Sequence, residues 1–574
     1  MSFARPLVAL LVTVTGLAAC GADDAADDPD AGPDAGPGVD PTEAVYDPTH
    51  VVQVDIELPA ADWDAMRLQS RPLSTLFGNC LAQPFPDPFT YFSGTVTIDG
   101  QRLTQVGVRK KGFLGSLDAV KPSIKLKFDE YVEQRFVGMK TLTLNNAKQD
   151  PSFVRQCLSY RTFTAAGVPA ARCNFAHVRV NGTDLGLYVN VEAANKNFLR
   201  RHYDDEDGNL YEGTLSDFRD GWTGTFELKT NETENDRTDL EALTTALEVP
   251  DSQLLGALGP LVDVDKFMTF WATETLVTHW DGYTGNANNF YAYHDPTSGK
   301  FEFIPWGVDG TLTSAENPFG GGGSAAVQAM SVLPRRLYSI IQTRDQYLAR
   351  MRALLDDVWD EPALLAELDR METLITPVVP SADRAGLAAA LDEVRDVVMT
   401  RRAAIEADLA GAPPVITEPL RAAPCFEDIG DLNGTFSTRW GTAGAPDPFS
   451  TGTGTLTGTI SGVPLSVTAV GATAGVDTDA MPVKYQIAAV ALLADGTVGL
   501  VVFQIEPSVF GPNRDLPIDW SNVLGVVYHY TPSTSAFVLV GLIGSGTLHL
   551  GQAGTAVNAT ISGSFTGDLI SSPF

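Results

Sequence analysis

Near the middle of the chain, one short stretch carries carboxylates and amides in an order that suits phosphate chemistry. In "HWDGYTGNANNFYAYHD", Asp281 lies two residues after His279 and five residues before Asn286. An aspartate in this order can accept the proton of an attacking hydroxyl, and the asparagine can turn back to hold a metal ion on phosphates. A second acid, Asp309, ends the next run, "KFEFIPWGVDG". The pattern indicates a phosphoryl-transfer site, although D-x-x-x-x-N is short and also arises by chance.

The segments that would position these acids alternate between strand and helix patterns. "VVQVDIEL" is typical of a strand, and "GTVTIDGQRLTQVGVRKKG" of a hairpin that turns at Asp99 and Gly100. In "SIKLKFDEY", alternation places Lys125 on one face of a strand and Ile124 and Leu126 on the other. "DPSFVRQCLSYRTFTAAG" has helical periodicity, and a second hairpin, "FAHVRVNGTDLGLYVNVE", follows it. These patterns predict an α+β domain over residues 48–412.

The remaining chain divides into a helical part and a β part. Residues 335–410 match the i, i+3, i+4 spacing of helices, which then stop at "APPVITEP". From about Cys425 the composition shifts to Gly, Thr, Ser and Val in short strands such as "VGLVVFQI" and "VLGVVYHY". This predicts an antiparallel all-β sandwich or barrel over residues 420–574. A chain of 574 residues is also too long for one ordinary core.

The overall charge excludes one class of partner. The chain has 71 acidic and 39 basic residues, which give a net charge of -32. Nucleic-acid phosphates would be repelled along most of such a surface, so we expect no nucleic-acid partner. The charge fits a soluble protein outside the cell, or one that recruits metal cations or basic partners.

The N-terminus has the pattern of a bacterial export signal. "MSFARPLVALLVTVTGLAAC" carries a basic residue, an apolar run and small residues before Cys20, and it resembles a lipobox. We therefore expect a lipoprotein signal peptide over residues 1–20 and an acyl anchor on Cys20. The protein would lie outside the cytoplasm, attached to the outer membrane or cell surface. Residues 21–47, rich in Asp, Ala, Pro and Gly, are predicted to be a disordered tether.

The other cysteines are expected to form disulfides. Cys80, Cys157, Cys173 and Cys425 are an even number in a chain with an export signal. They allow three pairings, and the sequence does not choose among them. Because C-x-x-C spacing is absent, metal binding by these cysteines is not predicted.

Several motifs together resemble the CotH (spore coat protein H) kinase family, from about Val51 to Arg402. These are "VGVRKKGFLGS", "KPSIKLKF", "LNNAKQDPSFVRQCLSYRTFTAAGVPAAR", "VNGTDLGLYVNVEAANKNFLRR", "GNLYEG" with "FELKTNETENDRTDLEAL", and "FEFIPWGVDG". Their shared order is more specific than any one of them. The resemblance implies an atypical protein-kinase-like fold and transfer of the ATP γ-phosphate to Ser or Thr of exported proteins.

The resemblance also implies roles for individual residues. Asp281 matches the catalytic Asp, and Asp309 matches the second Asp of P-W-D-x-D, which would bind Mg²⁺ or Mn²⁺. Spacing from Asp281 selects Asn286 as the amide ligand, whereas alignment on "FYAY" selects Asn289, so both remain candidates. Glu192 matches a hairpin Glu that would pair with a strand lysine.

The nucleotide-binding residues follow from the same comparison. Lys111, Lys121, Lys125 and Lys127 all lie in range of the phosphate-binding lysine, and Lys125 is favoured by its place on a polar strand face, with Lys111 next. Trp306 is a candidate to stack on the base of ATP.

Two positions depart from the family pattern and keep a second function open. Gly307 stands where most relatives have the first Asp of P-W-D-x-D, and Asn195 stands where the family often has Asp. Loss of a metal ligand would leave a lipid-anchored surface or matrix protein that uses the kinase-like fold to bind a partner. Asp281 and Asp309 are both present, and Mg²⁺ needs few protein ligands, which favours the enzyme.

Overall fold

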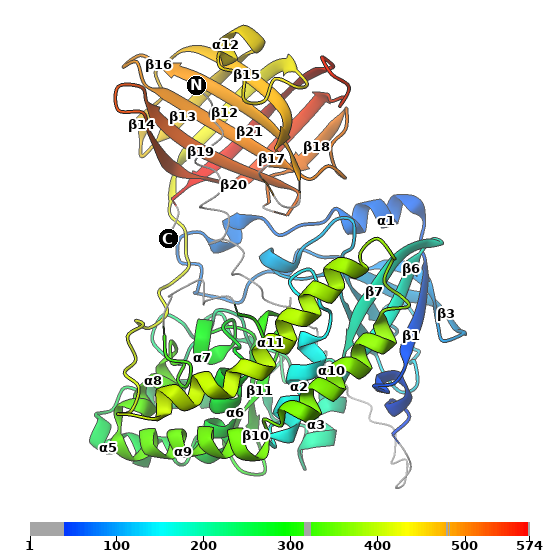
Figure 1. Cartoon of the computed structure of the whole chain (residues 1–574), viewed down its shortest axis with the longest axis vertical. Helices are drawn as coiled ribbons and strands as arrows, with labels where there is room; N and C mark the ends of the chain where they lie inside the picture. Colours follow the sequence, from blue (N-terminus) through cyan, green and yellow to red (C-terminus); the bar gives the residue numbers. More distant parts are fainter. Residues whose placement is uncertain (1–39, 315–322, 478–479, 481–482, 520, 572–574) are drawn as a thin grey trace.

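The computed structural model describes residues 40–314, 323–477, 480, 483–519 and 521–571. It has a lower α+β part and an upper all-β part, joined by an extended segment (Figure 1). The fold class is α+β followed by an all-β domain, as predicted. The predicted signal peptide, Cys20 and the tether up to residue 39 lie outside the described residues.

The first unit is a closed barrel in the order β1-β2-β3-β4-β5-β7-β6. Strands β1 and β6 close it in parallel. The strands are β1 (Val51–Glu57), β2 (Phe92–Ile98), β3 (Gln101–Lys111), β4 (Ser123–Lys127), β5 (Thr141–Asn145), β6 (Cys173–Val180) and β7 (Thr183–Val191). Helix α1 (Ala60–Arg67) and the short 3-10 helices η2 (Leu73–Leu76) and η3 (Leu114–Ser116) connect them.

Alternation along the barrel strands separates an apolar interior from a polar outer face. Ile124 and Leu126 of β4 lie in the barrel core, as the sequence pattern predicts. On the other face, Lys125 pairs in register with Arg109 of β3 and Thr143 of β5. This outer face of β3, β4 and β5 is buried too, so other parts of the chain cover it.

The predicted tether extends too far toward the barrel. Composition assigned residues 21–47 to it, but Glu43–Tyr46 form the 3-10 helix η1. Val45 and Tyr46 are buried against the barrel core, because two apolar side chains suffice to dock this short segment. The folded part of the described chain therefore includes this segment before the barrel.

A second sheet and its helices carry the catalytic candidates. The sheet order is β11-β10-β8-β9. Its strands are β8 (Asn209–Gly213), β9 (Glu227–Leu228), β10 (Phe290–Asp295) and β11 (Lys300–Pro305). The helices beside it are α2 (Arg155–Ala165), α3 (Lys196–His202), α4 (Thr238–Ala246), α5 (Asp251–Leu258), α6 (Val264–Leu276) and α7 (Tyr283–Asn286).

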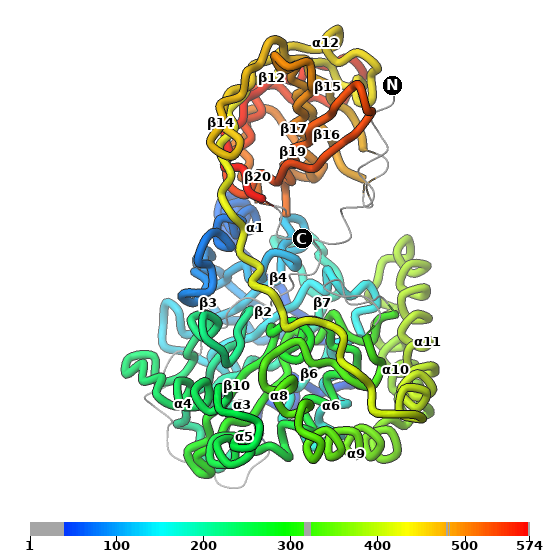
Figure 2. Tube along the Cα trace, turned by 90° about the vertical axis from the view of Figure 1, so that its left-hand side faces the viewer, coloured from blue at the N-terminus to red at the C-terminus, as the bar shows by residue number. Residues whose placement is uncertain are grey.

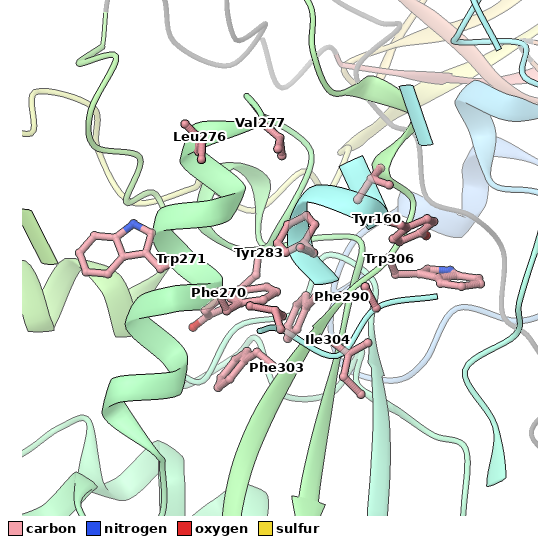
Figure 3. Packing of buried hydrophobic residues seen from close by; sticks show 14 of the residues in the cluster. Tyr160, Phe270, Trp271, Leu276, Val277, Tyr283, Phe290, Phe303, Ile304 and Trp306 are labelled. Atoms are coloured by element: carbon pink, nitrogen blue, oxygen red, sulfur yellow. The ribbon is translucent and has the colours of Figure 1, made fainter. Parts of the chain in front are cut away.

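The predicted helical part follows as α8 (Val332–Ser339), α9 (Ile341–Asp357), α10 (Glu361–Ile375) and α11 (Arg384–Leu409). These helices and the second sheet share one large hydrophobic core. Figure 3 shows its aromatic part around α6, β10 and β11. Within the described ranges, every helix is too short or too polar to cross a membrane.

The all-β domain is one curled antiparallel sheet in the order β14-β13-β12-β21-β20-β19-β17-β16-β15, with β18 paired to β20. Its strands are β12 (Asp428–Arg439), β13 (Thr453–Ile460), β14 (Val463–Pro464), β15 (Val467–Asp477), β16 (Lys484–Leu493), β17 (Val498–Ile505), β18 (Arg514–Pro517), β19 (Val523–Thr531), β20 (Ala536–Gln552) and β21 (Thr560–Ile570), with helix α12 (Pro448–Thr451). A bridge between Trp440, which follows β12, and Ala474 of β15 brings the edge strand β15 back to β12. Of the two predicted forms, the barrel-like one is therefore the closer.

We call residues 410–427 the strap, because they run along the α+β part and up to the β domain (Figure 2). Disulfide Cys80–Cys425 ties the strap to the loop after η2, and Cys157–Cys173 joins α2 to β6. The structure thus selects one of the three pairings that the sequence left open.

Candidate active site

The loop from α6 to β10 gathers three asparagine amides around one carboxylate. Asp281 is 1% exposed. Its Oδ1 accepts hydrogen bonds from Asn286 Nδ2 (2.7 Å) and Asn288 Nδ2 (3.1 Å), and its Oδ2 accepts from Asn289 Nδ2 (2.9 Å). The carboxylate predicted as catalytic base is therefore held in one orientation by groups that can only donate to it.

Glu274 of α6 fixes the backbone of this loop from below. Its carboxylate accepts from the backbone N–H groups of Tyr283 (3.0 Å) and Thr284 (2.9 Å) and from the Thr284 hydroxyl (2.7 Å). A Cβ on Gly282 would lie 2.3 Å from Glu274 Oε1, so the glycine after Asp281 is needed for this close approach. Sequence reasoning missed Glu274 because nothing in its helical pattern marks it as different from a surface acid.

Asp309 lies in the 3-10 helix η4 (Val308–Gly310), directly after β11, and is 2% exposed. Burial, reinforced by the Asp150 carboxylate, raises the pKa of Asp309 to about 6, against hydrogen bonding from its own backbone and from Asn145. Burial also raises the pKa of Asp281 well above its usual range, and the charge of Asp309 adds to this. The two predicted acids are therefore close enough to repel each other.

Gly307 and Asn289 occupy one small space. Gly307 has φ +52°, in the left-handed region, and a Cβ built on it would lie 2.6 Å from Asn289 Cγ. The Asn289 carboxamide therefore fills the place where a side chain at position 307 would begin. Gly307 replaces the family's first Asp of P-W-D-x-D, and the Asn289 side chain takes up the space that an Asp side chain would need. Asn289 is also the amide ligand that alignment on "FYAY" selects.

The outer face of the barrel lies opposite these acids. Asn145, at the end of β5, is the barrel side chain that hydrogen-bonds to Asp309. Lys125 and Arg109 lie on the same face as Asn145, through the register of β3, β4 and β5. The candidate lysine Lys125 is fully buried. The structure therefore brings its strand face to the acids, as a phosphate-binding role requires.

The predictions for Trp306 and Glu192 are wrong in detail. Trp306 is 2% exposed, with the Lys111 ammonium 5.6 Å from its ring centroid and Tyr291 edge-on at 5.4 Å, so it packs in the core and offers no open face to a base. Glu192 accepts from Arg172 Nη2 (2.7 Å) and from Arg201, and not from a strand lysine. Neither arginine belongs to the lysine-bearing strand motif, so the spacing of that motif did not reveal their pairing with Glu192.

A buried Lys–Glu pair does exist at another place that the motifs contained. Lys229 Nζ lies 3.6 Å from Glu212 Oε2 and 3.0 Å from Glu227 Oε1. Glu212 is on β8, beside Tyr291 of β10, and both Glu212 and Lys229 are nearly inaccessible. The sequence signal for this pair is the Glu in the strand "GNLYEG" and the Lys directly after the short strand in "FELKT".

Arg421 of the strap also enters the site. Its Nε donates to Asn286 Oδ1 at 2.5 Å, and its charge lowers the pKa of Asp281 against the larger effect of burial. The strap was predicted only as a break between domains, so no sequence pattern placed one of its side chains here.

Apolar side chains pack on two sides of the site. Tyr283, Phe290 and Phe303 pack tightly behind the loop, with ring centroids of Tyr283 and Phe290 4.5 Å apart (Figure 3). On the opposite side, Leu215 and Ala287 join an apolar cluster with strands of the β domain. A cavity of about 400 Å³ reaches Trp280 and Gln328, but Asp281 is not among its lining residues.

The residues present fit a divalent cation with a small set of protein ligands. Asp309 Oδ1 is buried without a hydrogen-bond partner, and its neighbour Asp281 makes an ion between them electrostatically favourable. Carboxylate and amide oxygens are the ligands that Mg²⁺ prefers, and Mg²⁺ retains several waters. In the described ranges, no group of three or more His, Cys, Asp or Glu side chains is arranged to hold a metal, so amides or phosphates would have to complete the shell.

Comparison with known proteins agrees with the sequence motifs. The family model "CotH kinase protein" matches residues 108–398. The chain is 26% identical over 279 residues to the inner spore coat protein H of Bacillus subtilis, covering 45% of this chain and 74% of that protein. It is 25% identical over 186 residues to the invasin CotH3 of Rhizopus delemar, covering 29% of this chain and 31% of that protein.

Among solved structures, the Helicobacter pylori proinflammatory kinase CtkA aligns with 50% of this chain and 92% of its own, at 11% identity and a TM-score of 0.26. The family match begins within β3, includes the loop around Asp281 and ends within α11. The resemblance predicted from the motifs is confirmed, and the chain belongs to the CotH kinase family.

Proposed function

We propose that this protein is an extracytoplasmic CotH-like kinase that transfers the ATP γ-phosphate to Ser or Thr of an exported protein. The observation that carries the proposal is the buried pair Asp281 and Asp309, with amides oriented on the first and an unsatisfied oxygen on the second. Structural carboxylates are normally paired or hydrogen-bonded, whereas two that repel each other in a buried place indicate a site built for a cation or a proton.

Each residue then has a defined task. Asp281 accepts the proton of the substrate hydroxyl and orients that hydroxyl towards the phosphate. Asp309, with Asn289, would hold Mg²⁺ or Mn²⁺, and the ion would neutralise phosphate charge when bound. Lys125, on the facing surface of the barrel, supplies positive charge for the ATP phosphates.

We also propose that the protein works outside the cytoplasm, attached to a membrane by an acyl group on Cys20. The disulfides Cys80–Cys425 and Cys157–Cys173 support this location, because such bonds persist in oxidising compartments. The partner would be an exported protein, either as substrate or as a surface partner.

The alternative is a catalytically inactive binding protein, and one observation favours it. Asp281, Asn286 and Asn289 are almost inaccessible, and the β domain packs over the neighbouring Leu215 and Ala287. In that case the kinase-like fold would serve recognition, and the β domain would be an adhesive unit.

Transfer of label from γ-labelled ATP, in Mg²⁺ or Mn²⁺, separates these functions. The full chain should label a Ser/Thr-containing acceptor, and Asp281→Asn and Asp309→Asn should each lower transfer by about 10²-fold or more. Asp204→Asn, at an exposed position, is the matched control and should change nothing. Transfer that persists in both site variants would contradict the roles proposed for Asp281 and Asp309. No transfer, together with no nucleotide-induced rise in Tm, would reject the kinase function in favour of the binding function.

A further inference from the structure

We propose that Arg421 is a positioning residue of the active site: its guanidinium fixes the Asn286 amide against Asp281 and leaves Asn289, beside Gly307, as the amide that faces the metal. The inference rests on the proposed kinase function and deepens it. It assigns a role to the strap, which lies beyond the matched family segment of residues 108–398.

The first step is the hydrogen-bond chain itself. Arg421 Nε donates to Asn286 Oδ1 (2.5 Å), and Asn286 Nδ2 donates to Asp281 Oδ1 (2.7 Å). A guanidinium can only donate and an ionised carboxylate can only accept, so an amide between them has a single possible orientation. Arg421 therefore determines which way Asn286 faces.

The second step is the consequence for metal binding. An asparagine ligates Mg²⁺ through its carbonyl oxygen, and the Asn286 oxygen already accepts a charged hydrogen bond. Asn289 instead lies against Gly307, 2.6 Å from the place of a Cβ there, in the loop that ends at Asp309. Of the two amides that the sequence left as alternatives, the geometry selects Asn289.

The third step is that Arg421 is fixed in place. Its backbone N–H donates to Met330 O (2.8 Å), and its carbonyl accepts from Arg219 Nη2 (2.5 Å). Arg219 in turn pairs with buried Asp217 at 2.9 Å. Four residues further on, Cys425 is joined to Cys80. Arg421 is 5% exposed, so its side chain is already buried in the site in this structure.

Steady-state kinetics of the full chain test the positioning role. Arg421→Met should lower kcat for transfer on the order of 10²-fold, as misplaced catalytic groups do, with KM for ATP nearly unchanged. Arg421→Lys keeps the charge without the planar fork and should recover only part of the loss. Guanidinium ion at low concentration should restore part of the Arg421→Met activity, with sodium chloride at the same ionic strength as control. Higher activity in Arg421→Met would overturn the inference, because the strap would then be an inhibitor.

Binding of Mn²⁺ alone, measured by titration without nucleotide, tests the ligand assignment independently of activity. Asn289→Leu should weaken Mn²⁺ binding, and Asn286→Leu should leave it close to that of the unchanged chain. Arg421→Met should strengthen it, since a neighbouring positive charge is removed and the Asn286 oxygen is released. Equal losses in Asn286→Leu and Asn289→Leu, or no Mn²⁺ binding at all, would contradict the assignment. Failure of phosphate transfer with this Mn²⁺ pattern intact would refute the kinase function alone.

Discussion

At the scale of single residues, the glycine at position 307 cannot simply be exchanged for the acid that most family members have there. Its left-handed backbone costs a non-glycine residue about 1–2 kcal/mol, and a Cβ would overlap Asn289. We expect Gly307→Asp and Gly307→Ala both to lower the free energy of unfolding by roughly 2 kcal/mol or more. Neither should raise kinase activity. Chemical denaturation followed by fluorescence measures the loss.

The double variant Gly307→Asp with Asn289→Gly provides the control, because it removes the overlapping carboxamide. Part of the lost stability should return. If Gly307→Asp alone is as stable as the unchanged chain, Asn289 does not fill this space.

The residues show what spacing can and cannot predict. Asp281, Asn286, Asn289 and Asp309 were proposed because their neighbours in the chain carry the motif, and the structure brings the two asparagine amides onto Asp281. The strand face of Lys125 was predictable because alternation is a local rule, and its role towards phosphates stays a prediction. Glu192 pairs with Arg172 and Arg201, which lie in other segments of the chain, and no local sequence pattern predicts such contacts.

At the scale of elements, helix α6 supports the candidate catalytic loop through Glu274. Replacing Glu274 by Leu leaves the Tyr283 and Thr284 donors buried and unsatisfied, at about 1–3 kcal/mol for each group. We expect Glu274→Leu to lower Tm and transfer activity together. Glu274→Gln retains one acceptor oxygen and should be affected less. Glu241→Leu, on an exposed face of α4, is the control. Unchanged activity in a folded Glu274→Leu variant would contradict this support.

The elements themselves were largely predictable, and their arrangement was not. Alternation gave the barrel strands, and helical spacing gave residues 335–410. That β1 closes the barrel in parallel with β6 depends on pairing across more than a hundred residues, which no turn signal specifies. The strap was predicted only as a break, because an extended segment docked by side-chain contacts has no periodicity of its own.

At the scale of the whole molecule, the two disulfides are expected to act differently. Cys157–Cys173 closes a 16-residue separation within the kinase-like domain, and losing such a short loop closure costs about 3 kcal/mol. Cys80–Cys425 instead fixes the strap that carries Arg421. Cys157→Ser/Cys173→Ser should therefore lower Tm with little effect on kcat at low temperature. Cys80→Ser/Cys425→Ser should lower kcat as well, and equal kcat in the two double variants would contradict this division.

The β domain has two apolar faces, and this explains why one of them packs against the kinase-like domain next to the candidate site. On β17, Val501 and Phe503 fill the inside of the curled sheet, whereas Leu500 and Val502 pack outward. An antiparallel sheet usually leaves one face to water, so a strand such as "VGLVVFQI" with both faces apolar needs a partner on each. Here the outer partner includes Phe113 and Leu215 of the kinase-like domain.

Breaking this contact tests whether the β domain governs access to Asp281. Val502→Asp places an unpaired charge in the interface, which costs on the order of 3 kcal/mol or more. We expect the domain to separate, seen as a larger radius of gyration in small-angle scattering and faster proteolysis of the strap. KM for a protein acceptor should fall as the site opens, while Val538→Asp, at a position 56% exposed on the same domain, should behave like the unchanged chain. A separated domain with an unchanged KM would show that acceptors reach Asp281 by another side.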